Sequence, residues 1–323
     1  MYVSIFELFK IGVGPSSSHT MGPMYAAVKF VDIIEKKFKD KPIKNIDIKL
    51  YGSLAYTGRG HKTYEAICLG LNRMKPDKLT NDIKLKILNQ IKSANKICIL
   101  NNNIDFDIDK NIKAIKKNEY PSHPNPLLFT CTFNDNTKYD KVFYSIGGGF
   151  IHYKDNHIKS TEMKYKYNFN SFDELKSICK KNSLNIYDII LENEYLNNNK
   201  TQVNKNILNI WYTMNKIINN GINSSGTIDD ILKVDKRAKY LNKKILKMDK
   251  YDPLQVMDKV SVYAIATCEE NASGNKIVTA PTNGAAGIIP AVIKYYTKVS
   301  EGNTDEKIIN FIATASAIGM LFK

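Results

Sequence analysis

The stretch IKNIDIKLYGS, residues 43–53, alternates between apolar and polar side chains. Ile46, Ile48 and Leu50 fall on one side of an extended chain, whereas Asp47 and Lys49 fall on the other. Because successive side chains of a β-strand point to opposite faces of the sheet, this period of two predicts a strand with one buried face. We therefore expect the first half of the chain to combine a sheet with helices.

The segments on both sides of this strand predict helices and further strands. Pro23 suits the first turn of a helix, and a second helix is expected at 63–71. LLFTCTF (127–133) and KVFYSI (141–146) predict two strands joined by a turn at 134–137. The first helix has an apolar face at i, i+3 and i+4 spacing, made of Met24, Ala27, Val28, Val31 and Ile34.

Helical patterns dominate after about residue 165, and strand signals nearly vanish. Helices are expected at about 172–181, 184–196, 204–220, 253–272, 287–298 and 305–322. The tract at 101–120 is interpreted as a surface excursion. The predicted fold class is α+β, with an α/β domain at residues 1–160 and an all-helical domain at 170–323.

The net charge of +15 raises the possibility of nucleic-acid binding. However, only Arg59, Arg73 and Arg237 are arginines, and guanidinium forks are the groups that read phosphates and bases. The lysines are interpreted as solvated faces, so no nucleic-acid partner is expected. No signal peptide opens the sequence, and the apolar run at 311–322 is too short to span a bilayer. These features predict a cytoplasmic protein without a membrane partner.

The five cysteines are scattered along the chain without paired spacing. They are Cys68, Cys98, Cys131, Cys179 and Cys268. Neither a disulfide framework nor a metal site follows from such spacing, and each thiol is expected to be a small buried side chain.

The loop VGPSSSHTMGP, residues 13–23, concentrates hydroxyl groups and a histidine ahead of a helix start. Ser16, Ser17 and Ser18, together with free backbone N–H groups, predict a cup for a carboxylate or phosphate. His19 adds a group that can act as an acid or a base. A capped helix with spare hydroxyls explains the same residues equally well.

Four further loops are small, polar and rich in glycine or proline. They span 51–63, 120–127, 144–150 and 278–288, and their candidate residues are His61, His123, Ser145, Thr282 and Asn283. Each loop alone is explained by a turn or a helix cap. Together they predict that five loops converge on one small polar substrate.

Four segments resemble, in the same order, the bacterial iron–sulfur-dependent L-serine dehydratases, also called L-serine ammonia-lyases. They are SIFELFKIGVGPSSSHTMGPM, YGSLAYTGRGHKT, YSIGGGFI and NASGNKIVTAPTNGAAGIIPAVIKYY. The resemblance covers nearly the whole chain. It implies that the first domain corresponds to the family's beta domain and the helical domain to its catalytic alpha domain. It also implies an enzyme that converts L-serine into pyruvate and ammonia. We expect a cytoplasmic homo-oligomer, with a dimer as the first expectation, and no pyridoxal phosphate, because the sequence shows no Schiff-base lysine motif.

The resemblance also assigns roles to the candidate residues. His61, His19 and Thr282 correspond to catalytic positions. The substrate-binding positions are Ser16, Ser17, Ser18, His123, Ser145 and Asn283.

A [4Fe–4S] cluster that acts as a Lewis acid on the leaving hydroxyl is implied by the resemblance. None of the five cysteines matches a ligand position, and the cluster cysteines are expected beyond Lys323. The chain is therefore expected to be truncated and catalytically inactive as given. A serine-binding remnant that has lost its chemistry is the alternative function, and a nucleic-acid binder is a weaker one.

Overall fold

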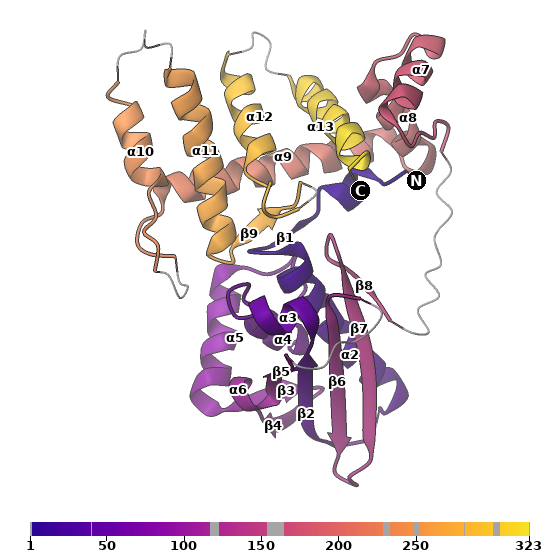
Figure 1. Ribbon diagram of the computed structural model, residues 1–323, viewed down its shortest axis with the longest axis vertical. Helices are drawn as coiled ribbons and strands as arrows, with labels where there is room; N and C mark the ends of the chain where they lie inside the picture. Colours follow the sequence, from indigo (N-terminus) through magenta and orange to yellow (C-terminus); the bar gives the residue numbers. More distant parts are fainter. Residues whose placement is uncertain are drawn as a thin grey trace.

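The computed structural model describes residues 2–39, 41–116, 123–153, 165–228, 233–248, 252, 254–280, 282–299 and 304–322. Its first part combines a sheet with helices, and its second part is built mainly of helices (Figure 1). Each part has a hydrophobic core of its own. The predicted α+β fold class is confirmed.

The main sheet of the described residues has five strands in the order β5-β2-β6-β7-β8. Strand β2 runs parallel to β5 and antiparallel to β6, and the remaining pairs are antiparallel. Ile46, Ile48 and Leu50 of β2 are fully buried, which confirms the strand predicted from their alternation. The strands are β2 (Ile43–Leu50), β5 (Ile112–Ala114), β6 (Pro126–Phe133), β7 (Lys138–Gly147) and β8 (Phe150–His152).

Helix α2 (Gly22–Lys37) connects the first candidate loop to this sheet. Pro23 occupies its first turn, and the whole predicted apolar face is buried. Phe30 of α2 stacks on Phe129 of β6, with ring centroids 5.0 Å apart. The helix also packs against α4 (Thr63–Leu71), which begins two residues after His61. The helix predicted at 63–71 is thus confirmed, and both helices start beside candidate site residues.

The prediction of a surface excursion at 101–120 is wrong for the described residues 101–116. Strands β3 (Lys96–Ile99) and β4 (Asn102–Asp105) form a hairpin, and β5 joins the main sheet after the short helix α6 (Ile108–Asn111). Ile104, Phe106 and Ile112 are buried. These apolar side chains are spaced among Asn and Asp residues. Their burial stabilises the strands even though the neighbouring residues are polar. Residues 117–120 lie outside the described residues.

Helix α9 (Lys200–Asn223) is the centre of the helical part. It contacts α10, α11, α12 and α13, which stand side by side along it (Figure 1). All six predicted helices are present, with ends shifted by up to four residues, whereas α10 was not predicted. The others are α7 (Phe172–Asn182), α8 (Ile186–Asn197), α10 (Ala238–Ile245), α11 (Gln255–Ala272), α12 (Ile288–Val299) and α13 (Asp305–Met320). No described helix combines the length and the apolar character that crossing a membrane requires.

A two-stranded antiparallel ribbon joins the two parts of the chain. Strand β1 (Ile11–Val13) pairs with β9 (Lys276–Val278), where Ile11 is opposite Val278 and Val13 is opposite Lys276. The candidate loop at 13–23 leaves β1, and the loop at 278–288 leaves β9. The ribbon therefore brings two loops together that are more than 250 positions apart in the sequence.

The first residues of the chain belong to the core of the helical part. Tyr2, with the short helix α1 (Ile5–Leu8), packs in that core. Glu194 of α8 accepts hydrogen bonds from Tyr2 Oη, Ser4 Oγ and Ile5 N–H at 2.9–3.1 Å. The chain thus starts in the helical part, crosses into the α/β part and returns. The domain limits of 1–160 and 170–323 stay a prediction.

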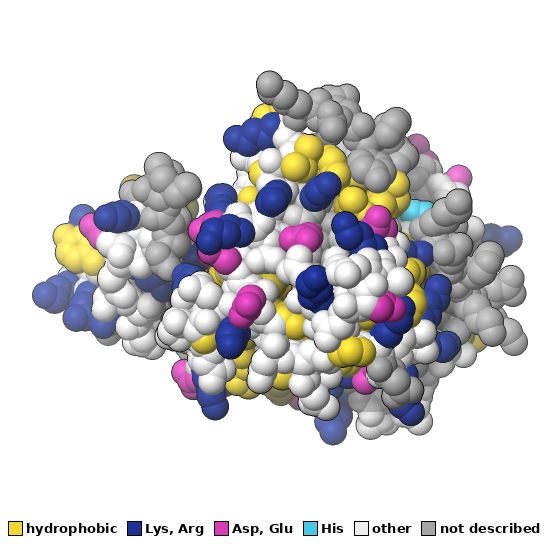
Figure 2. All heavy atoms as spheres, turned by 90° about the horizontal axis from the view of Figure 1, so that it is seen from below, with side chains coloured by type: hydrophobic (Ala, Val, Ile, Leu, Met, Phe, Trp, Pro, Cys, Tyr) yellow, Lys and Arg dark blue, Asp and Glu magenta, His cyan; other side chains and the backbone are white. Residues whose placement is uncertain are grey.

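Charged side chains are mixed on the face of the molecule seen from below in Figure 2. Lysine and arginine side chains are spread over this face with aspartate and glutamate between them, and no continuous basic band crosses it. Such a band is the usual footprint of a protein that follows a nucleic-acid backbone. The absence of a nucleic-acid partner remains an expectation.

Candidate functional site

The serine-rich loop folds into a single π-helical turn, η1 (Ser17–Met21), which continues into α2. Ser16 caps it, because its Oγ accepts a hydrogen bond from His19 N–H at 3.1 Å. Ser16 N–H donates to Thr20 Oγ1 at 3.1 Å, which closes the turn from the other side. Ser17 is buried, whereas Ser16, Ser18 and His19 stay partly exposed. The turn therefore presents two hydroxyls and the imidazole together.

The imidazole of His19 is held at both ring nitrogens. Its Nδ1 lies 2.8 Å from Ser18 Oγ, and its Nε2 lies 2.9 Å from Ser53 Oγ in α3 (Gly52–Thr57). Burial, followed by repulsion from His61, lowers the pKa of His19 to about 4. The ring is therefore neutral near pH 7, where one nitrogen donates to a serine and the other accepts from a serine.

His61 reaches the same place from the loop before α4. The two imidazole centroids are 4.8 Å apart, and the ring planes are tilted by 40°. Thr20 Oγ1 donates to the His61 carbonyl oxygen at 2.7 Å, and Thr63 Oγ1 donates to the His19 carbonyl oxygen at 2.6 Å. His61 Nδ1 lies 3.0 Å from the carbonyl oxygen of Thr57. Since a carbonyl only accepts, Nδ1 carries the proton, and Nε2 of the neutral ring is left as the acceptor.

Ser145 and His123 lie behind the π-helical turn. Ser145 Oγ donates to the carbonyl oxygen of Ser18 at 2.6 Å, so the buried serine supports the turn from the sheet. Glycine at position 22 permits this approach, because an ideal Cβ there would lie 1.9 Å from Ser145 Oγ. Asn125 donates through Nδ2 to the Ser145 carbonyl at 3.3 Å, and its N–H donates to His123 Nδ1 at 3.0 Å. These contacts place His123 two hydrogen bonds away from Ser145.

The loop after β9 reaches the other end of the serine-rich loop. Asn283 Nδ2 donates to the Val13 carbonyl at 3.3 Å and to Asn271 Oδ1 at 3.2 Å. Asn271 Nδ2 in turn donates to the Pro15 carbonyl at 3.1 Å. Thr282 is exposed, and its carbonyl accepts a hydrogen bond from Ala280 N–H at 3.1 Å. The structure thus ties Asn283 to the site loop, whereas no hydrogen bond joins the Thr282 side chain to that loop among the described residues.

Two buried acceptors in this region have no hydrogen-bond partner among the described residues. They are Oδ1 of Asn283 and Oδ1 of Asn125, in side chains that are 3% and 9% exposed. An unpaired buried carbonyl is costly, so such atoms are candidates to receive a donor from a ligand. The Asn283 amide is tied to the Val13 carbonyl, and the Asn125 amide is tied to the Ser145 carbonyl.

Sequence reasoning missed several residues that shape the site. Ser53 contacts His19 directly, and it stands inside the quoted loop at 51–63. Its signal was its place three residues after the end of β2, behind Gly52, whose φ of +51° turns the chain. The side chains of Asn271 and Thr63 donate hydrogen bonds to backbone carbonyls of the serine-rich loop. Such contacts leave no local pattern in the sequence.

The cysteines do not form a ligand set for a metal cluster. The five lie on five different elements, α4, β3, β6, α7 and α11. Burial raises the pKa of Cys68 and of Cys131 to about 12, which keeps both as thiols. Within the described ranges, no group of three or more His, Cys, Asp or Glu side chains is arranged to hold a metal ion. The residues present therefore do not fit a [4Fe–4S] cluster, which needs clustered thiolates.

Comparison with known proteins matches both parts of the chain to one family. The profile of the serine dehydratase beta chain matches residues 4–156, and that of the serine dehydratase alpha chain matches residues 181–323. L-serine dehydratase TdcG of Escherichia coli K12 is 36% identical over 329 residues, which cover 99% of this chain and 72% of that protein. The L-serine dehydratase of Haemophilus influenzae is 37% identical over 330 residues, with 99% and 72% covered. That of Streptomyces coelicolor is 36% identical, with 100% and 72% covered.

Proposed function

Because the chain belongs to the serine dehydratase family and joins the beta-type and alpha-type parts in one polypeptide, we propose that it is a lyase acting on L-serine. The reaction is the conversion of L-serine into pyruvate and ammonia. The observation that carries the proposal is the convergence of His19 and His61, from two loops, at a centroid distance of 4.8 Å. Amino-acid degradation is the corresponding cellular role.

The reaction needs two groups to leave neighbouring carbons. The proton of Cα and the hydroxyl of Cβ depart together as water, which leaves aminoacrylate. Aminoacrylate tautomerises to an imine, and a second water hydrolyses the imine to pyruvate and ammonia. The site therefore needs a base near Cα, donors for the carboxylate and an acceptor for the ammonium group.

His61 is the base in this proposal. Its Nδ1–H is committed to the Thr57 carbonyl, so the neutral ring offers Nε2 to the substrate. The hydrogen bond also orients the ring and stabilises the imidazolium that forms when Nε2 takes the Cα proton. A backbone carbonyl plays the orienting part here that a carboxylate plays in other histidine bases.

His19 positions hydroxyl donors and does not take the proton. A pKa of about 4 makes its ring a weak base near pH 7. Held between Ser18 and Ser53, the ring fixes the direction of both hydroxyls. Ser16, Ser17 and Ser18 are proposed to bind the substrate carboxylate through Oγ and backbone N–H groups at the start of the helical turn.

Asn283 is proposed to receive the substrate ammonium group. Its Nδ2 is held by Val13 and Asn271, whereas its buried Oδ1 has no partner among the described residues. An ammonium donor would satisfy that oxygen and would remove the cost of leaving it unpaired. His123, Ser145 and Thr282 remain proposed site residues. Of these, Ser145 acts on the turn through the Ser18 carbonyl.

The family resemblance implies a [4Fe–4S] cluster, and the proposal keeps it. The described residues, however, offer no site that could bind it. A cluster iron would supply Lewis-acid assistance to the departing hydroxyl. Since the described residues do not offer its ligands, no step of the mechanism is assigned to it here. The scattered cysteines favour a second candidate function, in which the chain binds L-serine without converting it.

The experiment that tests the proposal measures binding and turnover on the same sample. The 323-residue chain is titrated with L-serine by calorimetry, and pyruvate is assayed with lactate dehydrogenase before and after anaerobic reconstitution with iron and sulfide. Pyruvate from L-serine but not from D-serine supports the lyase. Binding without pyruvate supports the second candidate, and absence of both contradicts the two.

A further inference from the structure

Three consecutive polar residues, Glu269, Glu270 and Asn271, lie near the end of helix α11. The side chains of the two glutamates are buried, with exposed fractions of 6% and 5%. Asn271 donates to the Pro15 carbonyl in the serine-rich loop, whereas the proposed mechanism uses neither glutamate. Because burying a carboxylate is costly unless it is paired and hydrogen-bonded, the partners of each glutamate indicate what it does.

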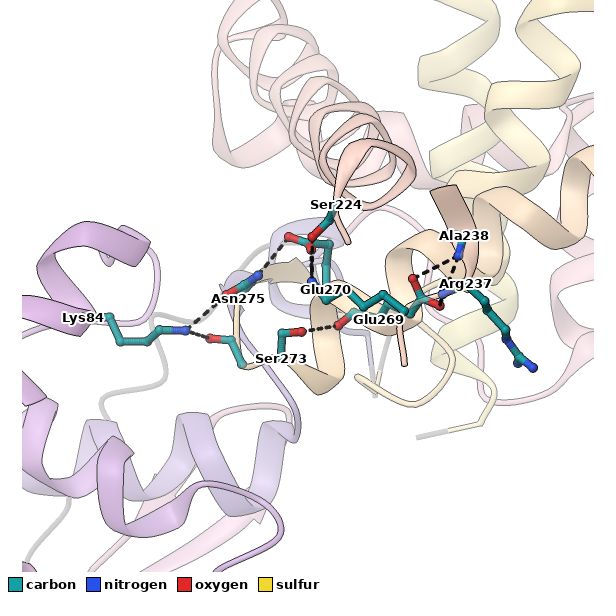
Figure 3. A network of polar contacts seen from close by, with 10 residues as sticks. Lys84, Ser224, Arg237, Ala238, Glu269, Glu270, Ser273 and Asn275 are labelled. Atoms are coloured by element: carbon teal, nitrogen blue, oxygen red, sulfur yellow. Dashed lines mark hydrogen bonds and ion pairs between the residues drawn. The ribbon is translucent and has the colours of Figure 1, made fainter. Parts of the chain in front are cut away.

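Glu269 holds the start of helix α10. Its Oε1 accepts hydrogen bonds from Arg237 N–H at 2.8 Å and from Ala238 N–H at 3.3 Å (Figure 3). The N–H groups at the start of a helix have no partner within the helix, and they attract negative charge. Glu269 thereby fixes the backbone directly after Lys236.

Lys236 meets the second glutamate. Its Nζ lies 3.1 Å from Glu270 Oε1, and the two side chains are 8% and 7% exposed. Lys236 Nζ also donates to Ser224 Oγ, just after the end of α9, at 2.9 Å. Removing one partner of a buried ion pair leaves an uncompensated charge, and the surrounding groups have to move to compensate it. The position of the Glu270 carboxylate therefore depends on Lys236.

Glu270 connects this ion pair to the serine-rich loop. Its Oε2 accepts a hydrogen bond from Asn275 Nδ2 at 3.0 Å (Figure 3). The backbone carbonyl of Asn275 in turn accepts one from Gly14 N–H at 3.0 Å. The loop and the end of α11 approach closely here, because an ideal Cβ on Gly14 would overlap the Asn271 carbonyl oxygen. A series of contacts thus runs from the ion pair through Asn275 to the loop.

We propose that Lys236 and Glu270 form a positioning pair that sets the serine-rich loop in the arrangement that binds L-serine. The proposal rests on the proposed function, because it concerns the same substrate. Neither side chain is assigned a contact with the substrate. Lys236 acts through Glu270, and Glu270 acts through Asn275 on the backbone of Gly14. Because the loop supplies the donors proposed for the substrate carboxylate, its displacement weakens the binding of L-serine.

Two single variants break the pair in different ways. Lys236→Met removes the ammonium group. Glu270→Gln leaves one oxygen, which cannot serve both Lys236 and Asn275 as the two carboxylate oxygens do. The Kd for L-serine, measured by calorimetric titration, is expected to be about tenfold weaker in each variant than in the wild type. Lys236→Arg keeps the charge and is expected to bind within about threefold of the wild type.

Glu269→Gln is the matched control for Glu270→Gln. It removes the same charge one position earlier in α11, and its remaining oxygen can still accept from Arg237 and Ala238, since Oε1 alone bonds to both N–H groups. The Kd of this variant for L-serine should differ from that of the wild type by less than about twofold.

Hydrogen exchange of the Gly14 amide, measured by NMR, reports on the loop without any substrate. The Gly14 N–H is protected by its hydrogen bond to the Asn275 carbonyl. Its exchange is expected to be at least about tenfold faster in Lys236→Met and Glu270→Gln than in the wild type. In Glu269→Gln the exchange rate should remain close to that of the wild type.

Further measurements separate the positioning pair from the proposed function. Circular dichroism verifies that each variant is folded. The double variant Lys236→Met/Glu270→Gln removes both charges and is expected to bind L-serine no more weakly than either single variant. Absence of L-serine binding by the wild type would contradict the proposed function, and the exchange at Gly14 would then decide on the pair alone.

Four results would each overturn the positioning pair. They are a wild-type exchange rate at Gly14 in both single variants, a wild-type Kd in either of them, an effect of Glu269→Gln equal to that of Glu270→Gln, and losses of affinity that add up in the double variant.

Discussion

The imidazole rings of His19 and His61 stand with their centroids 4.8 Å apart, although 42 positions separate the two residues in the sequence. The backbone fixes this contact from both sides. The residue after His19 donates its hydroxyl to the His61 carbonyl, and Thr63 donates its hydroxyl to the His19 carbonyl. This reciprocal pair of hydrogen bonds ties the position of each ring to that of the other. One loop supplies hydroxyl donors, and the other supplies His61 Nε2, which has no hydrogen-bond partner among the described residues.

Replacement of the proposed base is expected to abolish most of the turnover. His61→Gln keeps a polar side chain but removes the basic nitrogen, so kcat for L-serine should fall by about 10²–10⁴-fold. Because His61 lies in a partly exposed loop, Tm should change little. Steady-state pyruvate formation and thermal denaturation measure the two effects. A variant with wild-type kcat would remove His61 from the catalytic role.

Loss of the Ser53 hydroxyl is expected to loosen His19. Ser53→Ala removes the contact at 2.9 Å to Nε2, and the affinity for L-serine should fall by an amount that corresponds to about 0.5–1.5 kcal/mol. Ser93→Ala is the matched control, because Ser93 is exposed and its hydroxyl, among the described residues, bonds to the Gln90 carbonyl within its own helix. Calorimetric titration with L-serine measures the difference. Equal affinities of the two variants would contradict the positioning role of Ser53.

Local patterns in the sequence predicted those helices and strands that are long enough to show a clear hydrophobic periodicity. The eight residues of β2 and the apolar face of α2 were predicted because burial on one side leaves a regular trace. The ribbon of β1 and β9 was not predicted, because each strand has three residues and its partner lies in the other half of the chain. Helix α10 is short and contains few apolar residues, so its helical periodicity was too weak to predict it from the sequence.

The clustering of histidines and hydroxyl groups in loops was enough to predict which residues form the candidate site. The geometry of the site could not be predicted from the sequence. His19 and His61 were both singled out, and the structure brings them together. The hydrogen bonds that set the tautomer of His61 and the pKa of His19 depend on Thr57, Ser53 and burial, which are tertiary properties. The roles of Thr282 and His123 stay predictions.

Acidification is expected to destabilise the wild type through His19. The pKa of His19 is about 4 in the folded chain, below the ordinary value of 6.5. Between these values the unfolded chain binds more protons, so the free energy of unfolding should fall as the pH falls from about 6.5 to about 4. The stability linked to neutral His19 is fully present above that window. Urea denaturation across this range should show a steeper fall for the wild type than for His19→Gln, and parallel curves would contradict the shift.

A methyl group at position 22 is expected to disrupt the support of the π-helical turn. The Cβ of Gly22→Ala would lie 1.9 Å from Ser145 Oγ and 2.8 Å from Ser145 Cβ, so either the sheet or the turn has to move. The free energy of unfolding should decrease by about 1–3 kcal/mol. Gly284→Ala is the control, because no atom of the described residues lies within 4 Å of its Cβ position. Urea denaturation compares the two, and an equal effect would show that the close approach at Gly22 is unimportant.

The central claim is that His19 and His61 form one binding site for L-serine, and histidine-selective NMR tests it most directly. The chain is labelled at the histidine ring carbons, the signals are assigned with His→Gln variants, and L-serine and D-serine are added in turn. The account predicts that the signals of His19 and His61 shift with L-serine along one saturation curve, while His152 stays unchanged. Signals of His19 and His61 that do not respond to L-serine, or that follow two different saturation curves, would contradict it.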